Sequence, residues 1–258
     1  MKKISASLLH GLLWLFLLPP LMLAASSFTA DGTLLKVGSL GELTVQQYRD
    51  FLQNRELLMR FRNSAVLAGG ALLAGLPAAI LGGFWMHRGR SWFAACFRLL
   101  AAVAVLLPAQ SIMVPVFRLS KWTGLYDHLL SVILMQVFFP LGPLAVFFFL
   151  GRIPEEQWEA GWLDCNSSLR IYVRGILPQL RYPLVMLTLL LFAEAWNLVE
   201  WPLILLPDPG LQPASLALND ITESGRGSYA AAMLYCLPAV IACIVLTQKS
   251  PRRGFFAE

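Results

Sequence analysis

Long apolar segments alternate with short polar ones along most of this chain. Six of the apolar segments reach roughly 20 residues, the length at which an α-helix crosses the hydrocarbon core of a bilayer. The predicted spans are 8–27, 64–86, 93–117, 129–150, 183–206 and 228–247. Prolines interrupt most of them, which membrane helices tolerate because neighbouring helices satisfy the freed carbonyl groups. The pattern predicts an all-α, polytopic membrane protein with six transmembrane helices.

The first span has a second interpretation. Lys2 and Lys3 precede an apolar run that ends near residues 24–26, as in a cleavable signal peptide. The run is long for a signal peptide, however, and Pro19 and Pro20 lie inside it. We therefore expect the segment to remain in the protein as a membrane anchor.

The spans divide the chain into three parts. Residues 1–63 contain the first helix and an external loop, in which residues 44–59 are predicted to form a short amphipathic helix. Residues 64–247 form a five-helix core with a polar loop at 151–182, and residues 248–258 form a short tail. The polar loop is the segment in which the sequence says most about function.

Composition supports the membrane assignment, and charge indicates the orientation. Hydrophobic residues make up 57% of the 258 residues and charged residues only 14%, against roughly 25% charged in soluble domains. With the N-terminus inside, the inner segments hold eleven Lys and Arg residues and the outer segments eight, as the positive-inside rule requires. We therefore expect a multi-pass protein of the bacterial inner membrane with both termini cytoplasmic. The net charge of +5 then reflects topology, and no nucleic-acid partner is expected.

The sequence contains no motif for chemistry of its own. Its four cysteines form no CxxC pair or Cys/His cluster, so that neither a metal site nor a disulfide framework is indicated. Its three histidines fall in different segments, which argues against a membrane-embedded enzyme. The phosphate-binding motif G-x-x-x-x-G-K-[ST] does not occur. We therefore expect no cofactor in this chain, and any ATP hydrolysis must take place on another polypeptide.

The polar loop at 151–182 carries a helical pattern. Pro154, followed by two glutamates, suits the start of a helix. Apolar residues then recur every three or four positions, at Trp158, Trp162, Cys165, Leu169 and Tyr172. Because the middle of the stripe holds Asp164, Asn166 and Ser167, which suit a turn or a new N-cap, two short helices are expected. Gly175 and Pro178 are expected to end the pattern.

One series of residues in this loop is specific. It runs Glu159, Ala160, Gly161, Asp164 and, further on, Ile176-Leu177-Pro178. The series resembles the EAA loop of ABC importer permeases, in which Glu-Ala-Ala precedes Asp-Gly and a later Ile-x-Leu-Pro. In that family the loop forms a coupling helix that docks in a cleft of a separate ATP-binding subunit. The resemblance makes Glu159, Ala160, Gly161, Asp164, Cys165 and Pro178 the candidate coupling residues.

Cys165 departs from the family pattern, which has glycine at this position. If the backbone there needs a positive φ, cysteine strains it by roughly 1 kcal/mol or more. Asn166 offers another residue for the turn. We expect an altered or less efficient coupling loop, but not a lost one. The alternative interpretation of the loop is a generic amphipathic segment at the membrane surface.

Further short motifs resemble the carbohydrate-type, MalG-like permeases. They are Leu107-Pro108-Ala109-Gln110 with Pro115, Gly124-Leu125, Ala195-Trp196-Asn197, Trp201-Pro202-Leu203, Leu216-Ala217-Leu218 and Pro238. Each motif is short, but together they follow the order and spacing of that family from about Thr44 to Gly254. The resemblance implies a fold like that of a type I ABC importer permease.

The resemblance also implies partners and a substrate class. The expected partners are two copies of an ABC ATPase that bind ATP-Mg, a second permease subunit in a heterodimer, and an extracytoplasmic solute-binding protein. The expected substrate is a carbohydrate or a related polyol or glycerophosphate; the alternative is a polyamine, an amino acid or a cofactor. A secondary transporter or a membrane scaffold is the alternative outside the ABC class, although no internal inverted repeat is evident.

Two carboxylates lie within the predicted fifth span. Glu194 and Glu200 flank Trp196 and Asn197, and a carboxylate in hydrocarbon costs several kcal/mol unless it faces water or a polar interior. The interpretation we favour is that Glu194, Trp196, Asn197 and Glu200 border the translocation path, with an aromatic ring offered to a sugar. The alternative is that Glu200 sits at the outer interface beside Trp201.

Overall fold

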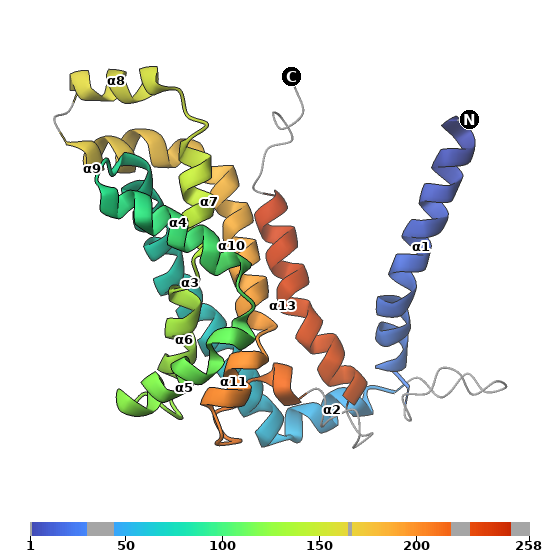
Figure 1. The fold of residues 1–258 in the computed structure, drawn as a ribbon. Coiled ribbons are helices and arrows are strands. Elements are labelled where there is room, and N and C mark those ends of the chain that lie inside the picture. The colour runs from blue at the N-terminus through green and yellow to red at the C-terminus, as the bar shows by residue number, and fades with distance from the viewer. Residues whose placement is uncertain (1, 30–43, 165–166, 218–227, 249–258) are drawn as a thin grey trace.

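The computed structural model describes residues 2–29, 44–164, 167–217 and 228–248, and these residues form helices without β-strands (Figure 1). The α-helices are α1 (Lys2–Ser26), α2 (Gln46–Gln53), α3 (Arg55–Arg88), α4 (Trp92–Leu106), α5 (Met113–Trp122), α6 (Leu129–Val137), α7 (Leu141–Leu150), α8 (Glu155–Asp164), α9 (Ser168–Ile171), α10 (Arg181–Trp196), α11 (Glu200–Leu205) and α13 (Ser228–Gln248). Short 3₁₀ turns at Ala109–Ile112 and Leu177–Leu180 and a π-helical turn at Tyr172–Ile176 connect some of them. The predicted all-α class is confirmed.

Three helical stretches in the described part of the chain are long and apolar enough to cross a membrane. They are Arg55–Arg88, Leu129–Leu150 and Ser168–Trp196. The stretch from α4 to α5 counts as a fourth if its two halves, which are bent by 113°, form one span. The apolar parts of α1 and α13, Trp14–Ser26 and Tyr229–Ala242, are shorter. The count of six spans therefore stays a prediction.

Helix α3 is the central element and packs against α6, α7 and α10. It begins at Arg55 because the side chain of Asn54 accepts hydrogen bonds from the backbone amides of Glu56 (3.1 Å) and Leu57 (3.2 Å), the usual role of an N-cap. The single amphipathic helix predicted over 44–59 is therefore wrong, since extended backbone at Asn54 separates α2 from α3. The predicted boundary between residues 63 and 64 falls inside α3.

Small residues allow α3 and α7 to pack closely. A Cβ on Gly83 would lie 2.5 Å from Cβ of Val146, and one on Gly142 would lie 2.8 Å from Cβ of Ala79. Close backbone approach of this kind is typical of helix contacts inside membranes. The buried side chains around it, among them Leu150, continue toward α8 and α9. This packing forms a rigid support for the end of the bundle that carries the polar loop.

Three of the predicted spans are broken in the structure. The fourth, 129–150, is interrupted between α6 and α7. The third predicted span, 93–117, is interrupted at Pro108, where extended backbone follows α4, as expected for a residue that cannot continue the hydrogen-bond ladder. The fifth predicted span, 183–206, ends its first helix at Trp196 and resumes as α11 at Glu200. None of the three ranges forms one continuous helix.

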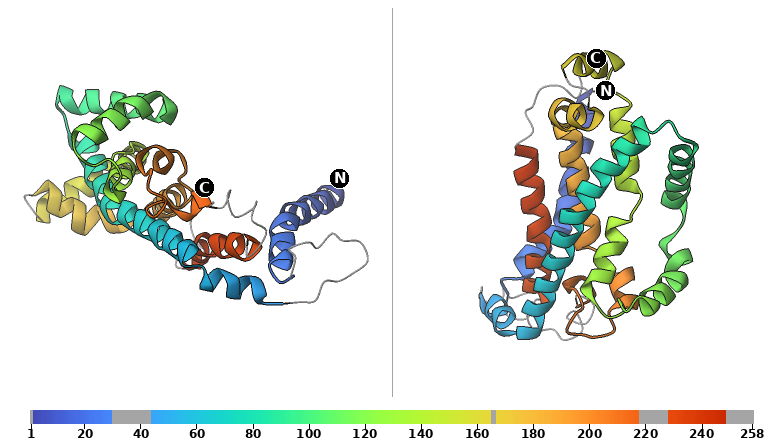
Figure 2. Two further views of the ribbon diagram at one scale, coloured as in Figure 1. Left: turned by 90° about the horizontal axis from the view of Figure 1, so that it is seen from below. Right: turned by 90° about the vertical axis from the view of Figure 1, so that its left-hand side faces the viewer.

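The helices form a bundle with distinct ends (Figure 1). Helices α8 and α9 lie at one end, and α2 and α11 lie at the other. Helix α1 begins, and α13 finishes, at the end that carries α8. Helices α4 and α5 lie on the flank opposite α1 and α13 (Figure 2). Gln47 connects α2 to the segment after α1 and to α13 at the far end of the bundle. Its Nε2 donates to the carbonyl of Thr29 after α1 (2.6 Å), and its Oε1 accepts from the amide of Ala230 in α13 (3.3 Å).

Candidate functional site

The polar loop folds into two short helices, α8 and α9, as the sequence predicts. Asp164 ends α8, and Cys165 lies outside the described residues. The predicted end at Gly175 and Pro178 is wrong, because the chain remains helical through both residues into α10. The π-helical and 3₁₀ turns there absorb the missing amide of proline without a break.

Trp158 fixes α8 to the end of the bundle. Its side chain is only 1% exposed. The indole ring stacks on the ring of His87 with centroids 5.8 Å apart, and it lies 6.4 Å from Phe84 and 6.5 Å from Tyr172. Phe84 in turn stacks on Tyr172 at 4.4 Å. These four rings form a continuous aromatic stack that joins α8 to the last turns of α3.

Polar contacts reinforce this attachment. Arg88, at the end of α3, forms an ion pair with Glu155 of α8 at 3.1 Å, and its guanidinium lies 4.8 Å from the centre of the Trp158 ring. The hydroxyl of Tyr172 donates a hydrogen bond to the carbonyl of Ile80 in α3 (3.0 Å). The ion pair is exposed and contributes little, so the buried ring contacts supply most of the attachment.

Gly161 allows α8 to approach α9 closely. A Cβ at this position would lie 2.5 Å from Cγ2 of Ile171, a buried β-branched residue that has little freedom to move. The close approach of the two helices therefore takes place at Gly161. Ala160 is exposed instead.

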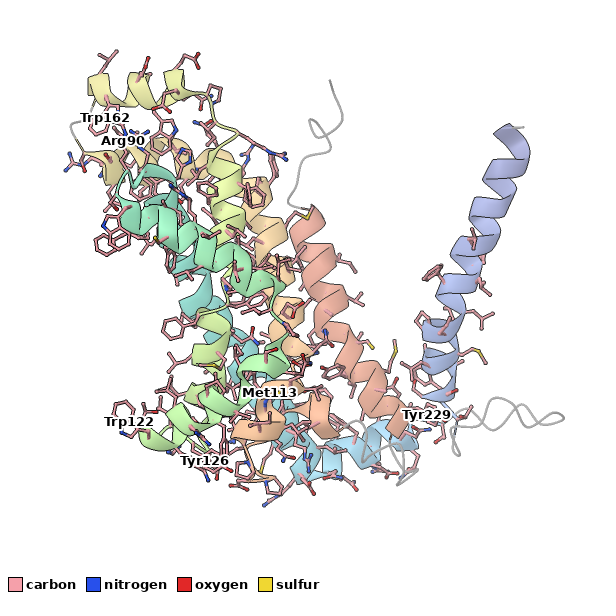
Figure 3. All side chains as sticks on the ribbon, in the orientation of Figure 1. Arg90, Met113, Trp122, Tyr126, Trp162 and Tyr229 are labelled. Atoms are coloured by element: carbon pink, nitrogen blue, oxygen red, sulfur yellow. The ribbon has the colours of Figure 1, made fainter. Side chains whose placement is uncertain are left out.

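The face of α8 that turns away from the bundle is exposed in the described part of the chain. Glu159 and Ala160 are exposed, and Leu163 is 90% exposed. Pro178 is also exposed, on the turn before α10. Figure 3 shows Trp162 at this end of the bundle, opposite Trp122 and Tyr126. A helix held on one side by a buried tryptophan, with a leucine and a carboxylate on the other, has the form of a docking surface.

The second candidate group lies where α10 ends. Glu194 is exposed and forms no hydrogen bond or ion pair within the described residues. Asn197 is also exposed, and its Nδ2 donates to the carbonyl of Ala193 (2.9 Å), which caps the helix. Glu200 is half-buried at the start of α11. Glu194 and Asn197 lie on one face at the end of α10, whereas Glu200 belongs to the next helix, α11.

Trp196 lies in the core, unlike Glu194, Asn197 and Glu200. It is 5% exposed and packs in the core between Phe192 and Tyr235. Its indole Nε1 donates to the carbonyl of Tyr235 (3.0 Å), while the Tyr235 hydroxyl donates to the carbonyl of Trp196 (2.7 Å). These reciprocal bonds join α10 to α13, so that Trp196 has a structural role in this chain.

One residue of this group was missed by reasoning from sequence. The Nε2 of Gln110 donates a hydrogen bond of 2.6 Å to Oε1 of Glu200, which lies 90 residues further along the chain. Gln110 belongs to the Leu107-Pro108-Ala109-Gln110 motif. A polar side chain two residues after a proline in an apolar span was the available signal.

The comparisons with known proteins agree on a family. Residues 72–250 match the family described as binding-protein-dependent transport system inner membrane component. A probable ABC transporter permease protein of Pyrococcus horikoshii is 28% identical over 57% of this chain and 56% of its own length. The chain thus matches about half the length of that relative.

Two further comparisons cover more of the chain. The trehalose transport system permease protein SugB of Mycobacterium tuberculosis is 26% identical over 92% of this chain and 86% of its own length. The crystal structure of a bacterial ABC transporter involved in the import of the acidic polysaccharide alginate contains a chain of the same fold, with a TM-score of 0.83, 17% identity, and coverage of 99% of this chain and 96% of that one. Because the family match covers more than half of the sequence, this chain belongs to the binding-protein-dependent transport system inner membrane components.

Proposed function

We propose that this chain is the membrane-spanning permease subunit of an ABC importer and that α8 is the helix through which a separate ATPase drives it. The observation that carries the proposal is the difference between the two faces of α8, one packed on the bundle and the other exposed. Trp158 and Gly161 bind it to the bundle, whereas Glu159 and Leu163 are exposed. A movement of α8 would pass through the aromatic stack to α3, the helix against which α6, α7 and α10 pack.

The partners belong to the same proposal. Two ATPase copies carrying ATP-Mg, a second permease subunit and an extracytoplasmic solute-binding protein would complete the transporter. The family description names a binding protein-dependent system, which supports this composition. Helix α4 exposes large apolar side chains, including Trp92, Phe93 and Leu100, which suits contact with lipid or with another permease subunit.

The orientation follows from the ends of the helices. Helix α1 begins and α13 finishes at the end of the bundle that carries α8. If α8 meets a cytoplasmic ATPase, both of these helix ends lie on the cytoplasmic side of the inner membrane. The excess of Lys and Arg in the predicted inner segments supports the same orientation.

The proposed substrate is a carbohydrate or a related polyol. The similarity to a trehalose permease supports this class. Glu194, Asn197 and Glu200 are the proposed residues of the translocation path, since their polar groups lie on uncovered or half-covered surface within an apolar segment. Replacement of Glu194 by Gln should lower uptake at unchanged expression. Unaltered uptake in membrane vesicles would remove Glu194 from the path.

Affinity purification tests the proposed assembly. The tagged chain is extracted from native membranes in a mild detergent, and its stoichiometric partners are identified by mass spectrometry. An ATPase should copurify with the wild-type chain and be lost from Glu159→Lys, because a reversed charge on the exposed face of α8 opposes docking. Arg49→Glu, an equal charge reversal on exposed α2 at the other end, serves as the control and should retain the ATPase. A chain that purifies alone from several detergents would favour a secondary transporter or a scaffold instead.

A further inference from the structure

Two of the breaks in the predicted spans, those after α4 and after α10, lie side by side. The break after α4 is followed by Gln110, and the break after α10 is followed by Glu200; the 2.6 Å hydrogen bond between these side chains joins them. Ala109 and Leu198, one from each break, pack against the same buried cluster. Interrupted helices commonly form the solute sites of transporters, because their polar groups are not consumed by regular helix bonds.

A stripe of uncovered side chains leads to this junction along α10. Met186 is 56% exposed and Leu190 is 42% exposed, and Glu194 and Asn197 follow at intervals of four and three residues. This spacing places all four on one face of the helix. The stripe changes from apolar to polar as it approaches the breaks, and it ends at Glu200.

The charge of this junction has a single sign. Glu194 and Glu200 form no ion pair within the described residues, and the partner of Glu200 is the neutral amide of Gln110. Arg60 and Arg88 form ion pairs with other carboxylates, those of Glu56 and Glu155. Carboxylates in a membrane protein face water or a polar partner, so the junction offers hydrogen-bond acceptors and negative charge to whatever occupies it.

We propose, on the basis of the proposed permease function, that this junction of Gln110, Glu194, Asn197 and Glu200 admits solutes that carry no negative charge. Hydroxyl groups of a neutral sugar donate to carboxylates, and an amino sugar adds charge attraction. A phosphate or carboxylate group is repelled, about threefold in bulk water and about a hundredfold where water is partly excluded, for a unit charge about 6 Å from one carboxylate.

Charged thiol reagents measure the sign of the electrostatic potential at this junction directly. The native cysteines are replaced by serine, and Leu190→Cys is introduced one turn from Glu194, about 6 Å along the helix axis. The complete transporter in membrane vesicles is treated with a cationic or an anionic methanethiosulfonate, and each rate is divided by the rate of that reagent with a free thiol. The cationic reagent should be favoured about tenfold or more, the ratio for unit charges 6 Å apart even in bulk water.

Matched variants make the test specific. The preference for the cationic reagent should fall toward unity when Glu194→Gln and Glu200→Gln are added. It should also be smaller at Met186→Cys, because this position is about 12 Å from Glu194 along the helix, beyond the screening length of about 8 Å. Equal normalised rates, a preference for the anionic reagent, or no reaction with either reagent would each overturn the proposal. Failure of the permease function is recognised separately, by the absence of a copurifying ATPase.

Discussion

Replacement of Trp158 by alanine should detach α8 from the bundle while the bundle itself remains folded. The indole is 1% exposed and contacts the rings of His87, Phe84 and Tyr172 as well as the guanidinium of Arg88. Truncation of a buried tryptophan to alanine costs about 3–5 kcal/mol. The buried Nε1 of Trp158 has no hydrogen-bond partner among the described residues. Burying this unpaired group costs about 1–3 kcal/mol, and the truncation removes that cost. We therefore expect a loss near the lower end, about 3 kcal/mol.

Hydrogen–deuterium exchange measures this loss locally. A change of about 3 kcal/mol in the opening free energy raises the exchange rate of the α8 amides on the order of a hundredfold. The amides of α3 near Ala71, far from the stack, should keep their protection. Leu163→Ala is the matched control, because Leu163 lies on the same helix but is 90% exposed. Unchanged exchange of α8 in Trp158→Ala, or equal acceleration in both variants, would refute the role assigned to the aromatic stack.

Two further predictions concern single groups. Gly161→Ala places a methyl group 2.5 Å from Cγ2 of Ile171 and should cost about 1–3 kcal/mol through overpacking, measured as faster hydrogen–deuterium exchange of the α8 amides. Gly175→Ala is the control and should not destabilise the protein, because no atom lies within 4 Å of the added carbon. Equal effects of the two variants would show that α8 does not depend on close packing at residue 161. Tyr235→Phe removes the hydroxyl that donates to the last carbonyl of α10 (2.7 Å) and should lower the thermal unfolding midpoint of the purified chain by roughly 2–4 °C. Tyr229→Phe on the same helix is the control. An equal shift in the two variants would contradict the role assigned to the Tyr235 hydrogen bond.

Much of the α8 region could be predicted because its signals are local. Pro154 and the acids after it set the start of the helix. The spacing of three and four residues correctly placed Trp158 and Tyr172 on a packed face, but it was wrong for Trp162 and Leu169, which are 39% and 50% exposed. The continuation of helix through Pro178 was not predictable in this way. A proline normally ends a helix, and the π-helical and 3₁₀ turns that accommodate this one are stabilised by tertiary packing of residues such as Tyr172 and Ile176.

The polar junction was harder to predict because its contacts are distant in sequence. Gln110 and Glu200 are 90 residues apart, and hydrophobic periodicity contains no information on which spans meet. Trp196 illustrates a second difficulty. An aromatic residue beside two carboxylates suits a sugar-binding face as well as a packed one, and only the position of Tyr235 on α13 shows that this ring is buried.

Site-specific photo-crosslinking from α8 tests the central claim most directly. A photoreactive amino acid is placed at Leu163, which is 90% exposed, and in a parallel variant at Leu52 of α2, which is 64% exposed at the other end of the bundle. Irradiation of native membranes should link an ATPase subunit to the first variant and not to the second. A crosslink to the ATPase from both positions, or from Leu52 alone, or the absence of any from Leu163, would contradict the assignment of α8 as the coupling helix.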